Sequence, residues 1–518
     1  MSANVPDAAE PAGPPLEATV KATNGGDDGG PPGFDQFLGH PKPLWMLFMS
    51  EFWERFAFYG IRWAMVLYIV AQFHGGDASG EKPASELYGA YLALVYAGAI
   101  FGGYVADKLI GYQRSILLGA LVMAAGLFML ALPTESLFKL GLATIIVGNG
   151  LFKPIISTLV GKVYAQGDAR RDSGFTIFYM GINLGAMIAP IITGWLARKV
   201  FGTDATPHYQ WVFISAGVGM LLSLVWFWFG RQQLKGIGMP LPEQAGAGRL
   251  GMVLLAGLAL GVPLFYTLLT INAEYLQYIL MAFFVIPAVM LFTEGVREGS
   301  VARDKVTAML MIFAFNVLFW MFFEQAGSSF TFLADKIVNR DFGSWTFHLE
   351  WFQSVNSVAI IVLAPILAWL WVRMGKNNPT IPRKFGLGLI FNGLAFLLLM
   401  VALKSMVDDA GKIPFWTLFM VYVIQSVGEL CLSPIGLSMT TKLAPARLTG
   451  FAMGCWFLSV AIGNNLAGIF AGRVSGEEGM TTTSALAGYT FGFWALLGAG
   501  VLLFLIAPLI QKLMHGVK

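Results

Sequence analysis

Long apolar segments recur along almost the whole chain, and short polar loops separate them. A helix that spans a bilayer needs about 20 mostly apolar residues, and fourteen segments meet that requirement. They lie near residues 44–73, 86–107, 115–132, 140–160, 173–197, 210–229, 250–270, 274–293, 305–333, 350–372, 385–403, 414–441, 448–472 and 485–511. The pattern predicts an all-α polytopic membrane protein with 14 transmembrane helices.

The start of the chain does not share this pattern. Residues 1–43 are rich in Pro, Gly, Ala and acidic side chains, and such a composition cannot bury enough apolar surface to fold. The segment also lacks the basic start and the short apolar core of a signal peptide. We expect a disordered cytoplasmic tail.

Composition supports the membrane assignment and excludes several other classes. The 518 residues are 56% hydrophobic and 12% charged, against about 25% charged in soluble domains. The net charge of +3 gives no indication of a nucleic-acid partner. Cys431 and Cys455 lie in apolar runs, so neither a disulfide nor a metal site is expected. No Ser/His/Asp set or phosphate-binding loop stands out in the spans, so an enzyme is not expected.

The distribution of basic residues predicts the orientation. With the N-terminus inside, the 33 Lys and Arg divide into 21 in cytoplasmic segments, 9 in external segments and 3 within spans. Cytoplasmic loops of membrane proteins carry this excess. Both termini are therefore expected in the cytoplasm.

Two distant parts of the chain resemble each other. Pro154 and Lys162 match Pro434 and Lys442 at one constant offset, and basic residues and an Asn-containing helix follow in both parts. Parallel halves of six spans are typical of major facilitator transporters, which bind substrate at midplane between the halves. We expect a major facilitator fold with halves at 44–230 and 303–512 and an inserted transmembrane hairpin at 249–294.

The loop after the second span supports this fold. Its sequence GGYVADKLIGYQR, residues 102–114, resembles the Gly-x-x-x-Asp-(Arg/Lys)-x-Gly-x-x-Arg signature of the same superfamily. Asp107 is therefore expected to act in gating, by pairing with a basic group or by capping a neighbouring helix.

Seven ionisable residues lie well inside the expected spans, where each charge costs about 2.5–3.5 kcal/mol or more. They are Glu51, Glu54, Arg55 and Arg62 on the first span, Lys153 on the fourth, Glu324 on the ninth and Glu429 on the twelfth. Glu51 and Arg55 are four residues apart and can pair directly. A cluster that only holds helices together is the alternative, but buried ion pairs stabilise poorly against apolar packing.

The sum of these charges suggests a proton site. Four acids against three bases leave one negative charge, which one proton neutralises. The five histidines all fall in tails or loops, so the carrier is expected to be a carboxylate. A carboxylate that exchanges its cationic partner during a conformational change would bind and release a proton.

The same residues suit a zwitterionic ligand. Arg62 and Lys153 can meet a carboxylate, and Glu324 and Glu429 can meet an amine. Candidate aromatic and amide residues around the ligand are Tyr59, Tyr96, Trp456, Asn183 and Asn356. For each of these five, ordinary helix packing is the alternative.

Four motifs together resemble the proton-dependent oligopeptide transporters, and the inserted hairpin resembles that of their bacterial members. The motifs are ExxERFAFYG from residue 51, GGYVADKLIG from 102, FTIFYMGIN from 175 and GELCLSPIGLS from 428. The resemblance implies a monomer in the bacterial inner membrane that imports di- and tripeptides with protons by alternating access. No cofactor other than the coupling proton is expected.

The resemblance also assigns roles. It implies proton coupling for Glu51, Glu54, Arg55, Lys153 and Glu324, with Lys153 pairing with the motif on the first span. It implies contact with the peptide for Tyr59, Arg62, Tyr96, Lys153, Asn183, Asn356, Glu429, Ser433 and Trp456. Two departures stand out: Phe58 replaces a tyrosine of many members, and Phe323 stands where some members have a polar or acidic residue.

Two other functions remain possible at this point. A nitrate or small-anion symporter of the same fold would need the cations but not Glu429 opposite them. A membrane receptor without transport would gain nothing from repeated halves and a charge imbalance of one proton.

Overall fold

The computed structural model describes residues 31, 33–165, 167–244 and 246–517. Most of the expected N-terminal tail, 1–43, lies outside the described residues. Its described part is not a featureless tail, because β1 (Gln36–Phe37) pairs antiparallel with β2 (His40–Pro41). The first long helix then begins at Lys42, slightly earlier than predicted.

The N-terminal half contains six long helices. They are α1 (Lys42–Phe73), α2 (Glu81–Val105), α3 (Tyr112–Leu130), α4 (Glu135–Lys162), α5 (Arg171–Trp195) and α6 (Gln210–Gly230). Short π-helical turns extend α2 to Ile110 and α5 to Val200.

The C-terminal half contains seven helices that form six spans. They are α10 (Ser300–Phe323), α11 (Ser329–Lys336), α12 (Trp351–Met374), α13 (Ile381–Ser405), α14 (Phe415–Leu443), α15 (Thr449–Ser475) and α16 (Thr482–Leu513). In the described chain, 14 helical stretches are long and apolar enough to cross a membrane, which confirms the predicted number.

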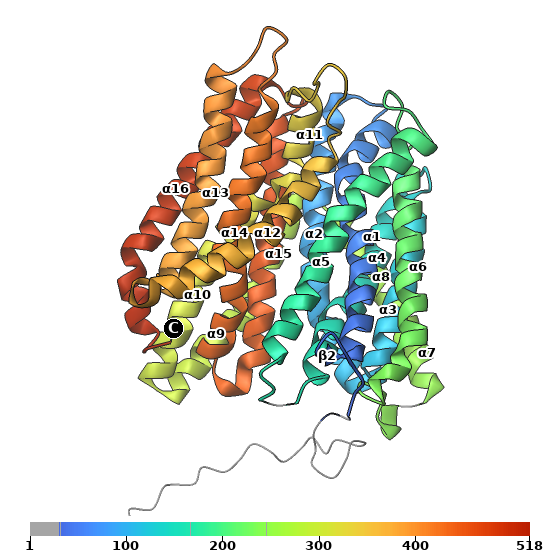
Figure 1. The fold of residues 1–518 in the computed structure, drawn as a ribbon, viewed down its shortest axis with the longest axis vertical. Coiled ribbons are helices and arrows are strands. Elements are labelled where there is room, and N and C mark those ends of the chain that lie inside the picture. The colour runs from blue at the N-terminus through green and yellow to red at the C-terminus, as the bar shows by residue number, and fades with distance from the viewer. Residues whose placement is uncertain (1–30, 32, 166, 245, 518) are drawn as a thin grey trace, which may run out of the picture.

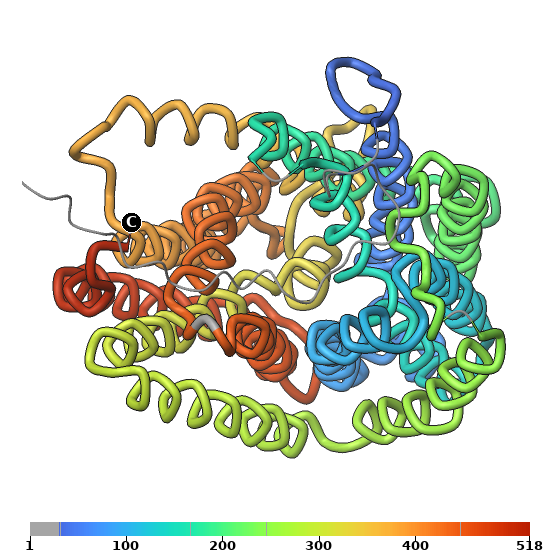
Figure 2. Tube along the Cα trace, turned by 90° about the horizontal axis from the view of Figure 1, so that it is seen from below, coloured from blue at the N-terminus to red at the C-terminus, as the bar shows by residue number. Residues whose placement is uncertain are grey.

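The inserted hairpin lies at the edge of the molecule. Its first span joins α7 (Ala247–Ala256) to α8 (Val262–Thr270) through a π-helical turn, and its second is α9 (Ala273–Glu298). Only 17% of the most apolar window is buried in each span, against 78% in α15. Figure 2 shows the yellow-green hairpin running along one side, from the N-terminal half to the C-terminal half.

The predicted ninth span is not one continuous helix. We expected a single helix over 305–333, but α10 ends at Phe323, a 3-10 turn covers Glu324–Gly327, and α11 begins at Ser329. A Cβ atom on Gly327 would lie 2.0 Å from the Tyr88 hydroxyl oxygen. The break therefore depends on a glycine that lets α2 approach closely.

The two halves meet along two helix pairs. α2 packs on α15, and α5 packs on α12. Gly89 and Gly468 set the first contact, since a Cβ on Gly89 would lie 2.6 Å from the Gly468 Cα atom.

The predicted repeat appears as matching helices in the two halves. Pro154 lies inside α4 and Pro434 inside α14, while Lys162 and Lys442 occupy the last turns of the same two helices. Figure 1 shows the blue-to-green half beside the orange-to-red half, with β2 and the C-terminus at one end. We call this the terminal end, and the opposite end the distal end.

Candidate functional site

A compact charge cluster occupies the middle of α1. The Arg55 guanidinium donates from Nη2 to Glu54 Oε1 at 2.7 Å, and its Nε lies 3.1 Å from Glu51 Oε1. Asn149 of α4 donates to the same Glu54 oxygen at 3.3 Å. The predicted Glu51–Arg55 pair is therefore confirmed, and Asn149 is a partner that the sequence did not suggest.

One oxygen of this cluster has no partner. Within the described part of the chain, Glu51 Oε2 is buried and makes no hydrogen bond. A buried acceptor without a donor is costly, and a proton on this carboxyl would reduce its charge. The position can thus hold a proton without disturbing the other bonds to Arg55.

A second ion pair joins the two halves at midspan. Arg62 Nη2 of α1 lies 2.5 Å from Glu324 Oε2, and the two side chains are 11% and 8% exposed. Glu324 directly follows the end of α10 and begins the 3-10 turn. The break in the ninth span therefore places this carboxylate against the first helix of the other half.

Lys153 does not pair with the carboxylates of α1. Its Nζ lies 4.1 Å from the centre of the Tyr96 ring and 6.0 Å from that of Phe58, while Arg55 contacts both Glu51 and Glu54. The pairing that the resemblance implied is absent in this conformation. Tyr96 in turn stacks on Phe457 of α15, so this part of the site also reaches the other half.

Glu429, like Lys153, has no oppositely charged partner in the described chain. Its Oε2 accepts a hydrogen bond from Asn356 Nδ2 at 3.2 Å, and the same amide donates to Ser426 at 2.9 Å. Of the seven intramembrane charges, only Lys153 and Glu429 have no oppositely charged group within 4.0 Å among the described residues. Both are partly exposed. One cation and one anion are therefore available to a ligand.

The other predicted ligand residues occupy varied surroundings. The Arg62 guanidinium lies 5.9 Å from the Tyr59 ring centre, which places that ring beside the inter-half pair. Asn183 donates to the Tyr179 carbonyl of its own helix at 3.0 Å, and the hydroxyl of Ser433 has no partner in the described structure. Trp456 is 4% exposed and packs on Phe313 and Phe385, inside its own half.

The predicted gating residue does not form an ion pair in the described chain. Asp107 accepts a hydrogen bond from the Tyr112 hydroxyl, and its carbonyl accepts one from Gln244 at 2.8 Å. These bonds fix the loop between α2 and α3. The gating role of Asp107 stays a prediction.

In the described chain, three ion pairs between Lys or Arg and Glu that the sequence did not predict join the halves at the distal end. Glu81 and Lys82 at the start of α2 pair with Lys336 and Glu477, respectively. Arg198, at the end of α5, lies 3.3 Å from Glu350, which directly precedes α12, and the side chains are 9% and 1% exposed. All of these residues lie within about five positions of a predicted span end, where a sequence does not tell buried from exposed charge.

The Arg198–Glu350 contact is tightly enclosed. A Cβ on Gly194 would lie 2.3 Å from Glu350 Oε1, so only a glycine allows α5 to approach this carboxylate. In the adjacent loop, the Lys199 ammonium donates to Asp204 at 2.5 Å and holds the pKa of that carboxyl below its usual range. Between described residues, every ion pair that joins the halves lies at midspan or at the distal end.

This arrangement is suited to alternating access. The distal end is held closed, and Lys153 and Glu429 at midspan keep part of their surface exposed. Arg62–Glu324 belongs to both halves and so must change if the halves separate at the distal end. Rearranging such pairs couples a relative movement of the halves to the charge state of the carboxylates.

Known proteins match the chain along most of its length. The profile of the POT family matches residues 113–484. Peptide transporter YePEPT of Yersinia enterocolitica is 36% identical over 94% of this chain and 98% of its own length. A di-/tripeptide transporter of Lactococcus lactis is 34% identical, over 93% and 98%.

Solved structures agree with the sequence matches. A crystal structure of a peptide transporter POT in complex with sulfate superposes with a TM-score of 0.81, at 36% identity, over 94% of this chain and 98% of that one. A mutant in complex with alafosfalin gives a TM-score of 0.80. The chain therefore belongs to the POT family.

Proposed function

We propose that this protein is a proton-coupled symporter that imports di- and tripeptides by alternating access. Its relatives in Lactococcus lactis carry the name di-/tripeptide transporter, and peptide transport is the function that the site supports best. The proton is the only cosubstrate that the proposal needs.

The observation that carries the proposal is the pair of charges without ion partners. Lys153 comes from the N-terminal half and Glu429 from the C-terminal half. A short peptide at neutral pH has a carboxylate at one end and an ammonium at the other, so its two ends match the charges of these two groups. Nitrate or another small anion would leave Glu429 without a positively charged partner, which disfavours the anion symporter.

Proton coupling is assigned to the carboxylates that contact arginines. Glu51 has one oxygen on Arg55 and one without a partner, and Glu324 holds Arg62 across the halves. We infer that protonation of one of these acids releases its arginine and permits the halves to move. Because four acids face three bases, one proton per cycle is enough to neutralise the set.

The direction of transport follows from the expected orientation. The excess of basic residues in the loops at the terminal end predicts that this end faces the cytoplasm. With this orientation the ion pairs at the distal end would close the external side, and we propose that the described conformation is an inward-facing state. We further propose that the protein acts as a monomer in a bacterial inner membrane.

The proposal is tested with purified protein in liposomes. Uptake of radiolabelled dialanine should rise when a proton gradient, acidic outside, is imposed and should fall when a proton ionophore is added. Unlabelled dipeptide should compete, whereas nitrate should not. Uptake that does not respond to the gradient would exclude coupling, and competition by nitrate would restore the anion symporter.

Glu51→Gln separates coupling from binding. The substitution keeps the size and polarity of the side chain but removes its proton chemistry. It should abolish gradient-driven uptake and retain most of the counterflow of peptide. Loss of peptide binding in this variant would instead place Glu51 in the substrate site.

A further inference from the structure

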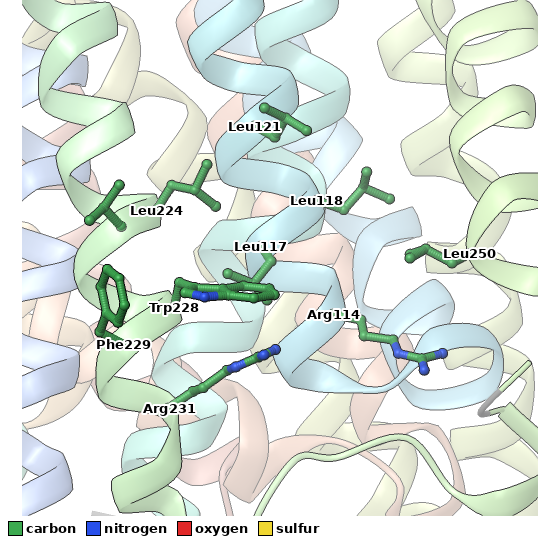
Figure 3. Close-up of a pocket in the computed structure, with 10 residues that line it drawn as sticks. Arg114, Leu117, Leu118, Leu121, Leu224, Trp228, Phe229, Arg231 and Leu250 are labelled. Atoms are coloured by element: carbon green, nitrogen blue, oxygen red, sulfur yellow. The ribbon is translucent and has the colours of Figure 1, made fainter. Parts of the chain in front are cut away.

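An apolar groove lies on the outer face of the N-terminal half, and none of the midspan charges lines it. It has a volume of about 700 Å³ and lies between α3, α6 and the start of α7. Its apolar wall includes Leu117, Leu121 and Leu224. In Figure 3, these leucines lie above the indole ring of Trp228.

Two arginines border the groove. Arg231, directly after α6, stacks on Trp228 with its Cζ atom 3.8 Å from the ring centre. Arg114 lies in the first turn of α3 and donates to the Gln244 carbonyl at 3.3 Å. Figure 3 shows both guanidiniums below the leucines, with Trp228 between Arg231 and the apolar wall.

The order of these groups matches that of a membrane leaflet. Arg114 and Arg231 stand at helix ends, whereas the leucines lie one or more turns inside α3 and α6. Tryptophan and arginine are favoured where hydrocarbon meets headgroups. The wall therefore faces the acyl region, and the guanidiniums face the headgroup region at the terminal end.

The charge of the site selects among lipids. No carboxylate lies within 4.0 Å of the Arg231 guanidinium in the described chain, and all charges that line the groove are positive. A zwitterionic headgroup would place its positively charged group near two arginines. The only charge of an anionic headgroup is the negative charge of its phosphate. Basic pockets between spans on this side of a membrane are suited to anionic headgroups.

We propose that this groove is a binding site for one anionic phospholipid. The phosphate lies between Arg114 and Arg231, and an acyl chain runs along Leu117, Leu121 and Leu224. The site is independent of the peptide site, and its selectivity for an anionic lipid rests on the expected orientation, which places the terminal end in the cytoplasm.

Native mass spectrometry of delipidated full-length protein in a neutral detergent tests the proposal. Phosphatidylglycerol should bind with at least five-fold higher affinity than phosphatidylcholine of the same chain length. Arg231→Gln should weaken phosphatidylglycerol roughly five-fold, since one cation near an anionic surface contributes about that factor. Arg231→Lys should restore most of the loss, and Leu121→Trp, which fills the wall, should weaken binding without changing charge.

Arg373→Gln is the matched control. Arg373 stacks on Trp369 near the end of α12. This contact has the same guanidinium and indole groups as Arg231 on Trp228, but neither residue lines the groove. Arg373→Gln should leave affinity for phosphatidylglycerol unchanged. The proposal would be overturned if phosphatidylglycerol and phosphatidylcholine bound with equal affinity. It would also be overturned if Arg231→Gln left the affinity for phosphatidylglycerol unchanged, or if Arg373→Gln lowered it as much as Arg231→Gln does. Competition by soluble glycerol phosphate at the concentration of the lipid would also overturn the proposal, because a free phosphate would then be sufficient.

Discussion

Single charges at midspan decide which ligand the protein can hold. Arg55 and Arg62 are already bound to carboxylates, so neither can neutralise a ligand without giving up a partner. Lys153 and Glu429 have no ion partner among the described residues, so each can bind a charged group of the ligand directly. The contribution of these two residues to binding should therefore be large and specific for the two ends of a peptide.

Glu429→Gln should remove recognition of the peptide amine. A hydrogen bond to a charged group contributes about 1.5–3 kcal/mol, so affinity for dialanine should fall roughly 10- to 100-fold. N-acetyl-dialanine has no ammonium, and the variant should bind it about as well as the unmodified protein does. Calorimetric titration with the two ligands measures the difference.

Glu324→Gln is the control for this experiment, because Glu324 is a carboxylate of the same half that already holds Arg62. It should keep the preference for dialanine over the acetylated ligand. An equal preference in Glu429→Gln and in the unmodified protein would show that the amine binds elsewhere.

Lys153→Met should act on the opposite end of the peptide. The methionine side chain is unbranched and only one atom shorter than that of lysine, and it removes the charge that lies over the Tyr96 ring. Dialanine should bind roughly ten-fold or more weakly, whereas dialanine amide, which has no carboxylate, should be affected little. Equal losses for both ligands would indicate that Lys153 supports the shape of the site and does not bind the carboxylate.

The sequence identified the intramembrane charges but not all of their partners. Spacing along one helix sufficed to predict Glu51–Arg55, because residues four apart share a face. The distal Arg198–Glu350 contact joins residues 152 positions apart and depends on how the halves pack. Whether Lys153 has an ion partner also depends on the conformation. In the described conformation, Arg55 pairs with both Glu51 and Glu54, and Lys153 pairs with neither.

At the scale of helices, hydropathy predicted the number of spans but not their interruptions. Apolar length alone defines a span, so the fourteen segments could be counted. The break at Glu324–Gly327 is different, because it replaces helical hydrogen bonds with contacts to α2 that no local pattern reports. The sequence EQAGSS contains a glycine, but glycine is common within membrane helices.

Close contact between α2 and α15 should make Gly89 sensitive to any side chain. In Gly89→Ala the new methyl group would meet the backbone of Gly468 at 2.6 Å, and backbone cannot move aside as a side chain can. Overpacking of this kind costs about 1–3 kcal/mol, so the melting temperature should fall by several degrees.

Gly454→Ala on α15 is the matched control for Gly89→Ala. No atom lies within 4 Å of the position that its Cβ would occupy. The melting temperature of this variant should stay within a degree of that of the unmodified protein. Similar melting temperatures for Gly89→Ala and Gly454→Ala would show that α2 and α15 are not in close contact in the membrane.

For the whole molecule, the unequal distribution of inter-half ion pairs sets the resting conformation. The three distal pairs hold that end closed, but they differ in burial. Both side chains of the Arg198–Glu350 pair are buried, at 9% and 1% exposed, whereas Lys336 of the Glu81 pair is 35% exposed and Glu477 is 82% exposed. Exposed pairs contribute about 0–1 kcal/mol, while removal of one partner from a buried pair costs about 3–5 kcal/mol. Arg198–Glu350 should therefore dominate distal closure.

Glu350→Gln should shift the protein toward a state that is open at the distal end. Ser354→Cys is a suitable reporter, because Ser354 lies one turn below Glu350, is 6% exposed and donates to the Met187 carbonyl across the halves. With Cys431 and Cys455 replaced by alanine, a membrane-impermeant maleimide added at the distal face should label the reporter at least ten-fold faster in Glu350→Gln. Glu477→Gln should change the rate less than two-fold. Equal labelling rates in the two variants would mean that distal closure rests on helix packing and not on the buried ion pair.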